Sequence, residues 1–334
     1  AAHRAGENRL LDLLVEHGVD VVAEHAKALM DYSQRMTEAT IAAIPDGKYT
    51  FEDALEGDGQ AEFDIPIKVK ITVNGSEMTV DFTGSAPQVA GNLNAVTAIV
   101  QSATWYCVRL LAEDDIPVNH GCFEPVIVIT EPGSVLNPDF PAAIAVGNTE
   151  TGQRVVDAVL GALHKALPDR IPAASQGSMN NLTVGGIREG RHFVYYETIA
   201  GGHGAGPAGD GVAGRHSHMT NTLNTPVEAL EHTLPLRVLT YALRDESGGE
   251  GQHRGGDGVN REYEFLTTAT VTLNTERRIR EPYGLRGGQP GQKGCNQLVR
   301  SGQSQDLGGK TTLAVQAGDR LIIETPGGGG WGAK

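Results

Sequence analysis

Glycine is the feature that most constrains what this chain can fold into. It supplies 44 of the 334 residues, roughly twice the level of about 7% that is usual in proteins, and it occurs in clusters rather than as a repeat. Well-patterned apolar stretches separate the clusters, so the sequence resembles neither collagen nor a flexible linker. Because glycine permits tight turns and close backbone approach, the pattern predicts a loop-rich α+β protein.

The periodicity of apolar residues changes along the chain and divides it into three regions. We expect a helical front over 1–46, a mixed α/β middle over 47–200 and a mostly antiparallel β region with glycine-rich loops over 201–334. No linker-like composition separates these regions. The sequence therefore predicts one compact unit.

Individual elements follow from local patterns. Residues 7–44 carry apolar side chains at a period of about 3.6 with a break at Gly18, which predicts two consecutive helices. Alternation on both sides of Asn74-Gly75 predicts a β-hairpin. Further helices are predicted at 95–112, 151–167 and 226–234. Strands are predicted at 65–73, 76–84, 124–131, 142–147, 192–200, 235–244, 260–266, 268–276, 296–300 and 319–326.

Charge and cysteine content limit the partners and the setting. The formal net charge of -14 argues against nucleic acid or an anionic membrane as the main partner, because both need a basic surface. The three cysteines, Cys107, Cys122 and Cys295, form no CxxC pair, so neither a disulfide framework nor a cysteine zinc site is indicated. We expect a reducing, cytoplasmic setting.

The stretch HSHMTNTLNTPVEALE, residues 216–231, is the first candidate site. If residues 215–220 are extended, His216 and His218 point to one face, where they suit metal binding or acid–base chemistry near neutral pH. Such a pair is more often simply solvated or hydrogen-bonded at a strand edge. Polar neighbours favour a site for an amide or carbonyl substrate, and these neighbours are His203, Asp210, Asn221, Asn224 and Glu228.

Two other polar clusters are candidates for ligand binding. In GNTETGQR, residues 147–154, the side chains Asn148, Glu150 and Gln153 accompany backbone N–H groups at a helix start, which suit an anion or a carbonyl oxygen. Capping by the two threonines explains this segment equally well. In ASQGSMNN, residues 174–181, Gln176 and Asn180 are either ligand-binding or turn residues.

The glycine-rich segments have their own alternatives. The terminal TPGGGGWG either wraps closely around another backbone or is a frayed end. The glycine spacings in 201–214 lack a surrounding βαβ unit, so dinucleotide binding is not predicted.

Several long motifs together resemble the hydantoinase B/oxoprolinase family, and the similarity covers essentially the whole chain. The motifs occur in the family's order and are DFTGSAPQVAGNLNA, GNTETGQRVVDAVLGAL, PAASQGSMNN, HMTNTLNTPVEALE, HRGGDGVNREYEF and TPGGGGWG. The resemblance implies a subunit of an ATP-dependent cytoplasmic enzyme that opens a cyclic amide such as hydantoin, 5-oxoproline or a lactam. A hydantoinase A-type, kinase-like subunit is expected to bind ATP and phosphorylate the substrate carbonyl.

The resemblance also implies where this chain differs from its relatives. Family members carry a longer N-terminal segment whose His and Asp residues are expected to bind a divalent metal, so we expect this chain to be one part of a larger hetero-oligomer and inactive alone. No metal site is therefore assigned to His216 and His218. With Asp210 they are expected to handle protons, while the other candidates position substrate. Two alternatives stay open: a subunit of an acetone or aryl-ketone carboxylase, and a non-catalytic assembly piece.

Overall fold

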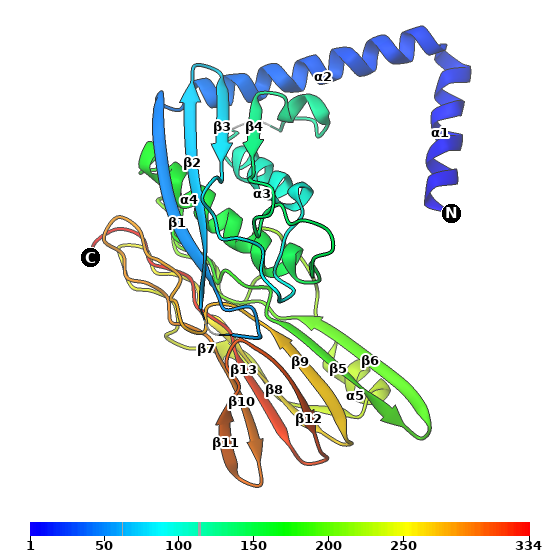
Figure 1. The fold of residues 1–334 in the computed structure, drawn as a ribbon, viewed down its shortest axis with the longest axis vertical. Helices are drawn as coiled ribbons and strands as arrows, with labels where there is room; N and C mark the ends of the chain where they lie inside the picture. Colours follow the sequence, from blue (N-terminus) through cyan, green and yellow to red (C-terminus); the bar gives the residue numbers. More distant parts are fainter. Residues whose placement is uncertain (62, 113–114) are drawn as a thin grey trace.

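Two long helices lead into a sheet that is covered by two further helices. The computed structural model describes residues 1–61, 63–112 and 115–334. The first sheet has the order β1-β2-β3-β4, with β4 parallel to β3 and the other pairs antiparallel. This N-terminal body (Figure 1) contains α1 (Ala2–His17), α2 (Val19–Ala42), β1 (Gly47–Glu56), β2 (Asp64–Asn74), β3 (Glu77–Asp81), α3 (Thr97–Arg109), η1 (His120–Phe123), β4 (Val126–Ile129), η2 (Gly147–Thr151) and α4 (Gly152–Ala166).

Strict alternation of buried and more exposed side chains in β2 explains how the N-terminal body forms its core. Every second side chain of β2, from Ile65 to Val73, is buried, and the pleat of a strand sends these side chains to one face. Gly75 makes the tight turn to β3 with a φ of 59°, a backbone conformation that glycine adopts without steric cost. Helix α4 packs on β1 and β2, and a Cβ at Gly161 would lie 2.7 Å from the ring of Phe51. The apolar core of this body therefore lies between the sheet and α4.

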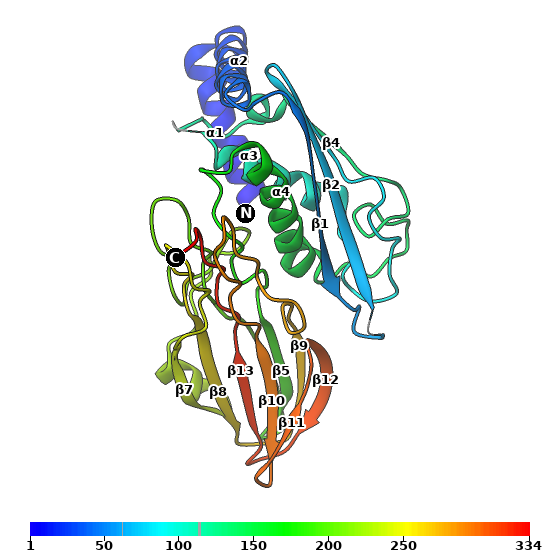
Figure 2. The same cartoon turned by 90° about the vertical axis from the view of Figure 1, so that its left-hand side faces the viewer.

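A second body is a sandwich of two antiparallel sheets (Figure 2). One sheet has the order β11-β10-β13-β8-β7 and the other β12-β9-β5-β6. Their facing apolar side chains form a second core, which includes Leu182, Phe265 and Leu321. The elements are β5 (Asn181–Arg188), β6 (Arg191–Thr198), α5 (Val227–Thr233), β7 (Leu236–Arg244), β8 (Gly258–Phe265), β9 (Ala269–Asn274), β10 (Cys295–Arg300), β11 (Gln303–Asp306), β12 (Lys310–Val315) and β13 (Arg320–Glu324).

A buried cluster of charges joins the two bodies. Arg154 of α4 is fully buried and pairs with Asp53 of β1 at 3.1 Å and with Glu276, just after β9, at 3.2 Å. Arg277 contacts Asp53 at 2.7 Å and Asp157 of α4 at 2.6 Å. Burial alone would raise the pKa of Asp53, but the two guanidinium groups lower it to about 2. These ion pairs fix α4, and the polar segment before it, against the sandwich.

The run of four glycines at 327–330 is buried inside the protein. Gly328 donates to the carbonyl of Gly256 at 2.9 Å, and Gly330 donates to that of Gln289 at 2.8 Å. A Cβ on Gly328 would overlap the carbonyl of His203. The interpretation of this segment as a frayed end is therefore wrong, because its glycines fill the space between loops of the same chain.

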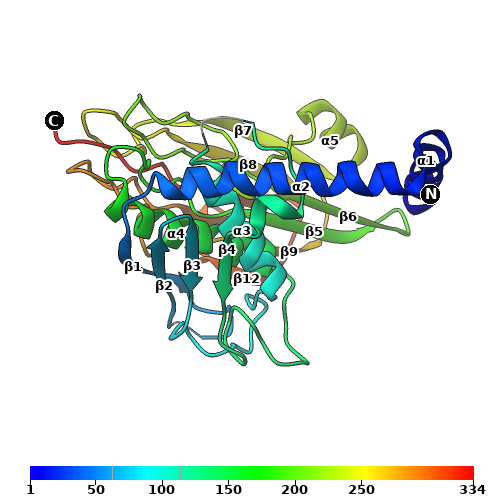
Figure 3. The same ribbon diagram turned by 90° about the horizontal axis from the view of Figure 1, so that it is seen from above.

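Helix α1 and the first half of α2 extend from the rest of the molecule as an arm (Figure 3). No residue of α1 is buried, and the buried residues of α2 begin at Ser33. None of the described helices combines the length and the apolarity needed to cross a membrane.

The predicted α+β fold with an antiparallel C-terminal region is confirmed, as are the hairpin and all five helices. The strand predicted at 142–147 is wrong: these residues form an irregular connection that runs into the π-helical turn η2. The predictions missed β1, β5, β11 and β12. In β5 the pair Gly185-Gly186 interrupts the apolar alternation, so pairing with its neighbours rather than local propensity makes the strand.

Candidate functional site

Five segments that are distant in sequence bring most of the predicted site residues together. They are η2 with the first turn of α4, the segment 174–181, the end of β6, the loop near His203, and the loop 216–225. Gly147 allows η2 to lie directly against the backbone of Asn94, where a Cβ would overlap a carbonyl oxygen. The glycine therefore places Asn148 and Glu150 in this assembly.

A cavity of about 300 Å³ is the hollow part of the assembly, and we call it the asparagine pocket. Three predicted substrate-binding residues, Asn148, Asn221 and Asn224, line it. Its other walls include Thr149, Met179, Tyr195, Tyr196, Glu197, Thr198, Met219, Thr220 and Thr222. Amide and hydroxyl groups of this kind donate and accept hydrogen bonds without carrying charge, which suits an amide or carbonyl ligand.

Glu197 is the buried carboxylate behind this wall. Its Oε1 accepts from Asn224 Nδ2 at 2.7 Å and from Arg261 Nη2 at 3.2 Å, and its Oε2 accepts from the hydroxyl of Tyr263. Tyr241 donates to Asn224 Oδ1 at 2.9 Å. Asn224 is thus held at both ends of its amide, which fixes its orientation towards the pocket.

Glu150 lies beneath the other side of the pocket and is fully buried. Its Oε1 accepts from Asn181 Nδ2 at 2.7 Å and from the backbone N–H of Met179 at 3.1 Å. Burial, with the nearby charge of Glu276, raises the pKa of Glu150 to about 7. The Glu150 side chain therefore sits near its protonation midpoint at neutral pH.

His216 and His218 do not share a strand face as expected. His218 has a φ of 56° and begins a turn, so the segment 215–220 is not extended. His218 Nδ1 lies 3.3 Å from the hydroxyl of Tyr106, and His216 Nδ1 lies 3.4 Å from that of Thr220. Both Nε2 atoms are buried without a hydrogen-bond partner. Burial lowers the pKa of His216, and lowers that of His218 to about 4, so both imidazoles are neutral near pH 7.

Two more predicted residues, Gln153 and His203, brace this loop rather than line the pocket. Gln153 donates to the carbonyl of Ser217 at 2.9 Å, and His203 Nε2 lies 2.9 Å from the carbonyl of His216. Gln176 accepts from Asn180 Nδ2 at 2.7 Å. Gln176 and Asn180 are fully buried, and Asn180 has a φ of 48°; their predicted role in ligand binding stays a prediction.

Asp210 and Glu228 lie apart from the asparagine pocket. Asp210 accepts from the backbone N–H of Arg254 at 2.8 Å and lies 3.7 Å from His253. Glu228 is exposed on α5. The catalytic role predicted for Asp210 and the binding role predicted for Glu228 stay predictions.

The sequence predicted either an anion cradle or threonine caps at the start of α4, and the structure shows a different arrangement there. Neither Thr149 nor Thr151 caps the helix; Thr149 donates to the carbonyl of Val146 at 3.2 Å, and Thr151 donates to that of Leu93 at 2.5 Å. The backbone N–H of Glu150 bonds to Val146. The hydroxyls therefore anchor the π-helical turn to its surroundings.

Buried polar atoms without a partner concentrate in this assembly. Such atoms are rare in folded proteins and call for an explanation at each position. They include Glu150 Oε2, Gln153 Oε1, Gln176 Nε2, Tyr195 OH, Thr198 Oγ1, His216 Nε2, Ser217 Oγ and His218 Nε2. The assembly thus holds more hydrogen-bonding capacity than its own side chains use.

No group of three or more His, Cys, Asp or Glu suited to a metal ion occurs within residues 1–61, 63–112 and 115–334. The two histidines point their Nδ1 atoms to hydroxyls of different elements. The divalent metal that the family resemblance implies was expected to bind residues outside this chain; that expectation stays a prediction, and we derive no step through a metal.

Glu197 and Tyr106 are site residues that the sequence did not reveal. Glu197 lies near the end of β6, and Tyr106 is on α3, 112 positions from His218. Only the polar residues of YYET hint at Glu197. Their roles depend on long-range pairing, which local patterns do not contain.

The site thus combines an α+β scaffold with a polar pocket that is lined by amide and hydroxyl groups and by the carboxylate of Glu197. The chain belongs to the hydantoinase B/oxoprolinase family, whose model matches residues 1–334. It is 39% identical to 5-oxoprolinase 1 from Arabidopsis thaliana over 345 residues, covering 100% of this chain and 26% of that protein. It thus spans about a quarter of that relative's length.

Solved structures show the same fold. The crystal structure of ATP-dependent caprolactamase from Pseudomonas jessenii matches with a TM-score of 0.89 and 27% identity, covering 99% of this chain and 59% of that one. A nucleotide-free acetone carboxylase matches with a TM-score of 0.83 and 17% identity, covering 97% and 50%, and this likeness concerns the fold alone.

Proposed function

We propose that this chain is part of an ATP-dependent enzyme that opens a cyclic amide, such as 5-oxoproline, a hydantoin or a lactam. The observation that carries the proposal is the asparagine pocket, which amide and hydroxyl side chains line, with His216 and His218 directly before the wall formed by residues 219–225. Membership of the hydantoinase B/oxoprolinase family supports the same class of substrate.

The proposed reaction overcomes the low reactivity of an amide. Phosphorylation of the carbonyl oxygen, with ADP as the other product, makes the carbon open to attack by water. The C–N bond then breaks as nitrogen gains a proton, and hydrolysis of the remaining acyl phosphate by a second water releases the acid and phosphate. ATP is bound by a hydantoinase A-type subunit or domain in this proposal, and the whole assembly works in the cytoplasm.

The residues of this chain would supply orientation and proton handling. Asn221 and Asn224 bind the polar edge of the amide, and Glu197 holds Asn224 in place. His218 accepts a proton from the attacking water in the neutral tautomer whose Nδ1–H donates to the hydroxyl of Tyr106, because this tautomer leaves the lone pair of Nε2 free. His216 and Gln153 support the loop that carries His218.

The complete protein that contains this chain, mixed with its A-type partner and ATP, tests the proposal. Ring-opened product and ADP are measured by chromatography with 5-oxoproline, hydantoin and caprolactam. At least one cyclic amide is expected to open with ADP release. Asn221→Ala should slow the reaction, while Asn8→Ala, on the exposed face of α1, should leave it unchanged.

Two results would contradict the proposal in different ways. Failure of all three substrates to open, with ATP turnover that requires bicarbonate and a ketone, would identify a carboxylase instead. Full activity of the Asn221→Ala, His216→Gln and His218→Gln variants would assign this chain an assembly role.

A further inference from the structure

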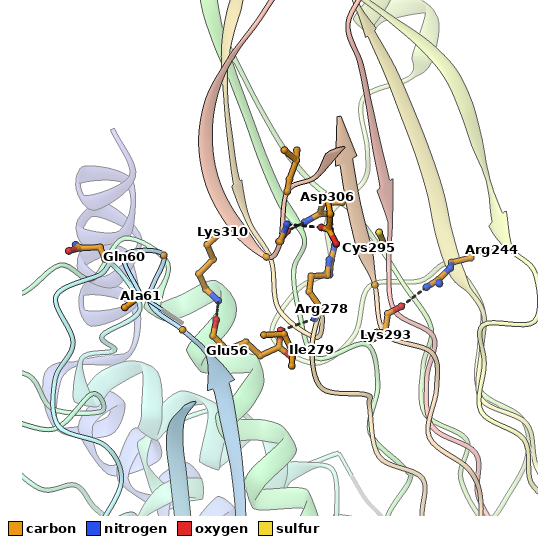
Figure 4. A pocket seen from close by; sticks show the side chains of 17 residues that line it. Glu56, Gln60, Ala61, Arg244, Arg278, Ile279, Lys293, Cys295, Asp306 and Lys310 are labelled. Atoms are coloured by element: carbon orange, nitrogen blue, oxygen red, sulfur yellow. Dashed lines mark hydrogen bonds between the residues drawn. The ribbon is translucent and has the colours of Figure 1, made fainter. Parts of the chain in front are cut away.

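A second cavity, of about 790 Å³, lies where the end of β1 meets the loops of the sandwich (Figure 4). It shares no lining residue with the asparagine pocket, and the proposed function does not use it. Its charged lining residues are Glu56, Arg244, Arg278, Lys293, Asp306 and Lys310. We call it the arginine cavity. Figure 4 shows Arg278 at its centre, between Glu56 and Lys310 on one side and Arg244 and Lys293 on the other.

Arg278 is a buried cation that no carboxylate neutralises directly. Its side chain is 8% exposed, and within the described part of the chain its guanidinium forms no ion pair with an Asp or Glu. Nη1 donates to Asn180 Oδ1 at 2.9 Å and Nη2 to Asn296 Oδ1 at 3.0 Å, both neutral amides. Nε is buried without a partner. Burial lowers the pKa of Arg278 to about 10, so the group is still charged at neutral pH.

The other charged side chains that line the cavity are mostly engaged elsewhere. The carboxylate of Glu56 accepts from the backbone N–H groups of Arg278 and Arg280, at 2.7 and 2.6 Å, and that of Asp306 accepts from the backbone N–H of Gly308 at 2.9 Å. Arg244 lies 3.8 Å from Glu324, and Lys310 is paired with Glu276. Lys293 is exposed and has no ion pair within the described residues. Arg278 and Lys293 are therefore the lining cations without an ion pair in the described part of the chain.

Glycine makes room for the guanidinium of Arg278. A Cβ at Gly294 would lie 2.7 Å from Arg278 Cζ and 2.7 Å from Nη1, closer than real Cβ contacts. The guanidinium thus lies close to the backbone at Gly294. This close approach, with the bonds to Asn180 and Asn296, holds the group in the cavity wall.

We infer that the arginine cavity binds a small oxyanion, a molecule bearing a carboxylate or phosphoryl group, through Arg278 with Lys293 at the rim. A planar guanidinium matches the oxygen spacing of both groups. Binding of such an anion supplies the neutralising charge that the protein itself does not place beside Arg278.

Calorimetric titration of the complete protein with inorganic phosphate, and separately with glutarate, at low ionic strength tests the inference. Saturable binding with a Kd on the order of 1 mM or tighter is expected for at least one anion. Lys293→Ala should weaken it about two- to fivefold, and Arg278→Gln about tenfold or more. Lys27→Ala, on the exposed arm, is the matched control and should bind as the unmodified protein does.

Comparison of the two anions identifies the chemical class of the ligand. Saturable binding of glutarate indicates a carboxylate ligand, and saturable binding of phosphate indicates a phosphoryl ligand. Absence of saturable binding by both overturns the inference. Unchanged affinity in Lys293→Ala together with unchanged affinity in a folded Arg278→Gln protein also overturns it. If Arg278→Gln does not fold, Lys293→Ala decides alone, since Lys293 is exposed and its loss leaves the core intact.

Discussion

His218 is the side chain on which the proposed chemistry depends most. Its lowered pKa of about 4 keeps it neutral, and its Nε2 has no partner within the protein. We expect His218→Gln to lower kcat/KM for ring opening by about 10²-fold or more, the usual range for a lost general base. Steady-state kinetics measure this, and His192→Gln, on an exposed position of β6, serves as control. A rate unchanged by His218→Gln would remove the residue from the mechanism.

Glu150 makes stability depend on pH in a predictable direction. Its pKa is raised from 4.5 to about 7 in the folded protein, so between these values the folded state binds more protons than the unfolded state. The contribution of this group to stability is therefore present at low pH and is lost as pH rises towards about 7.

Glu150→Gln should remove that contribution to the pH dependence while still providing an oxygen that accepts the hydrogen bond from Asn181 Nδ2. Thermal melting of both proteins between pH 4.5 and about 7 measures the difference. The gap in Tm between variant and unmodified protein should grow in favour of the variant as pH rises. A gap that is constant across this range would show that Glu150 does not carry a raised pKa.

At the scale of elements, η2 is the turn that positions Asn148 and Glu150, and it depends on Gly147. A Cβ at this position would overlap the backbone of Asn94. We expect Gly147→Ala to destabilise the protein by about 1–3 kcal/mol, as overpacking does, and to lower ring-opening activity. Urea denaturation provides the measurement.

Gly6→Ala is the matched comparison for this substitution. A Cβ at Gly6 would meet nothing within 4 Å, and the residue lies inside α1. Alanine in a helix interior is favoured over glycine by about 0.5–1 kcal/mol. If both alanine variants were equally stable, the close contact at Gly147 would not be what holds η2.

The elements differ in how well the sequence predicted them, for physical reasons. The hairpin at Asn74-Gly75 and the two front helices depend on local turn chemistry and periodicity, and they were predicted correctly. Strands β5 and β12 flank β9 in the same sheet, and their local patterns are weak. The polar segments near His216 and Gln176 were predicted as site candidates from their density, but their partners Glu197 and Arg278 were not, because each pairing spans many residues.

At the scale of the whole molecule, the ion pairs of Arg154 connect the N-terminal body to the sandwich. Arg154→Met leaves Asp53, Asp157 and Glu276 buried with less compensation. Breaking a buried pair in this way is expected to cost about 3–5 kcal/mol. Denaturant unfolding measures the loss, and Lys27→Met, which removes only the exposed pair with Asp31, should cost about 1 kcal/mol or less. Equal losses in the two variants would mean that the cluster does not join the bodies.

The buried glycines at 327–330 also determine the order in which the protein can be completed. Loops near Ala205, Gly256 and Gln289 form hydrogen bonds with this run, yet a ribosome makes the run after all three loops. These hydrogen bonds can therefore form only after the glycine run has been made, so the final packing of the three loops waits for a segment that follows them in the chain.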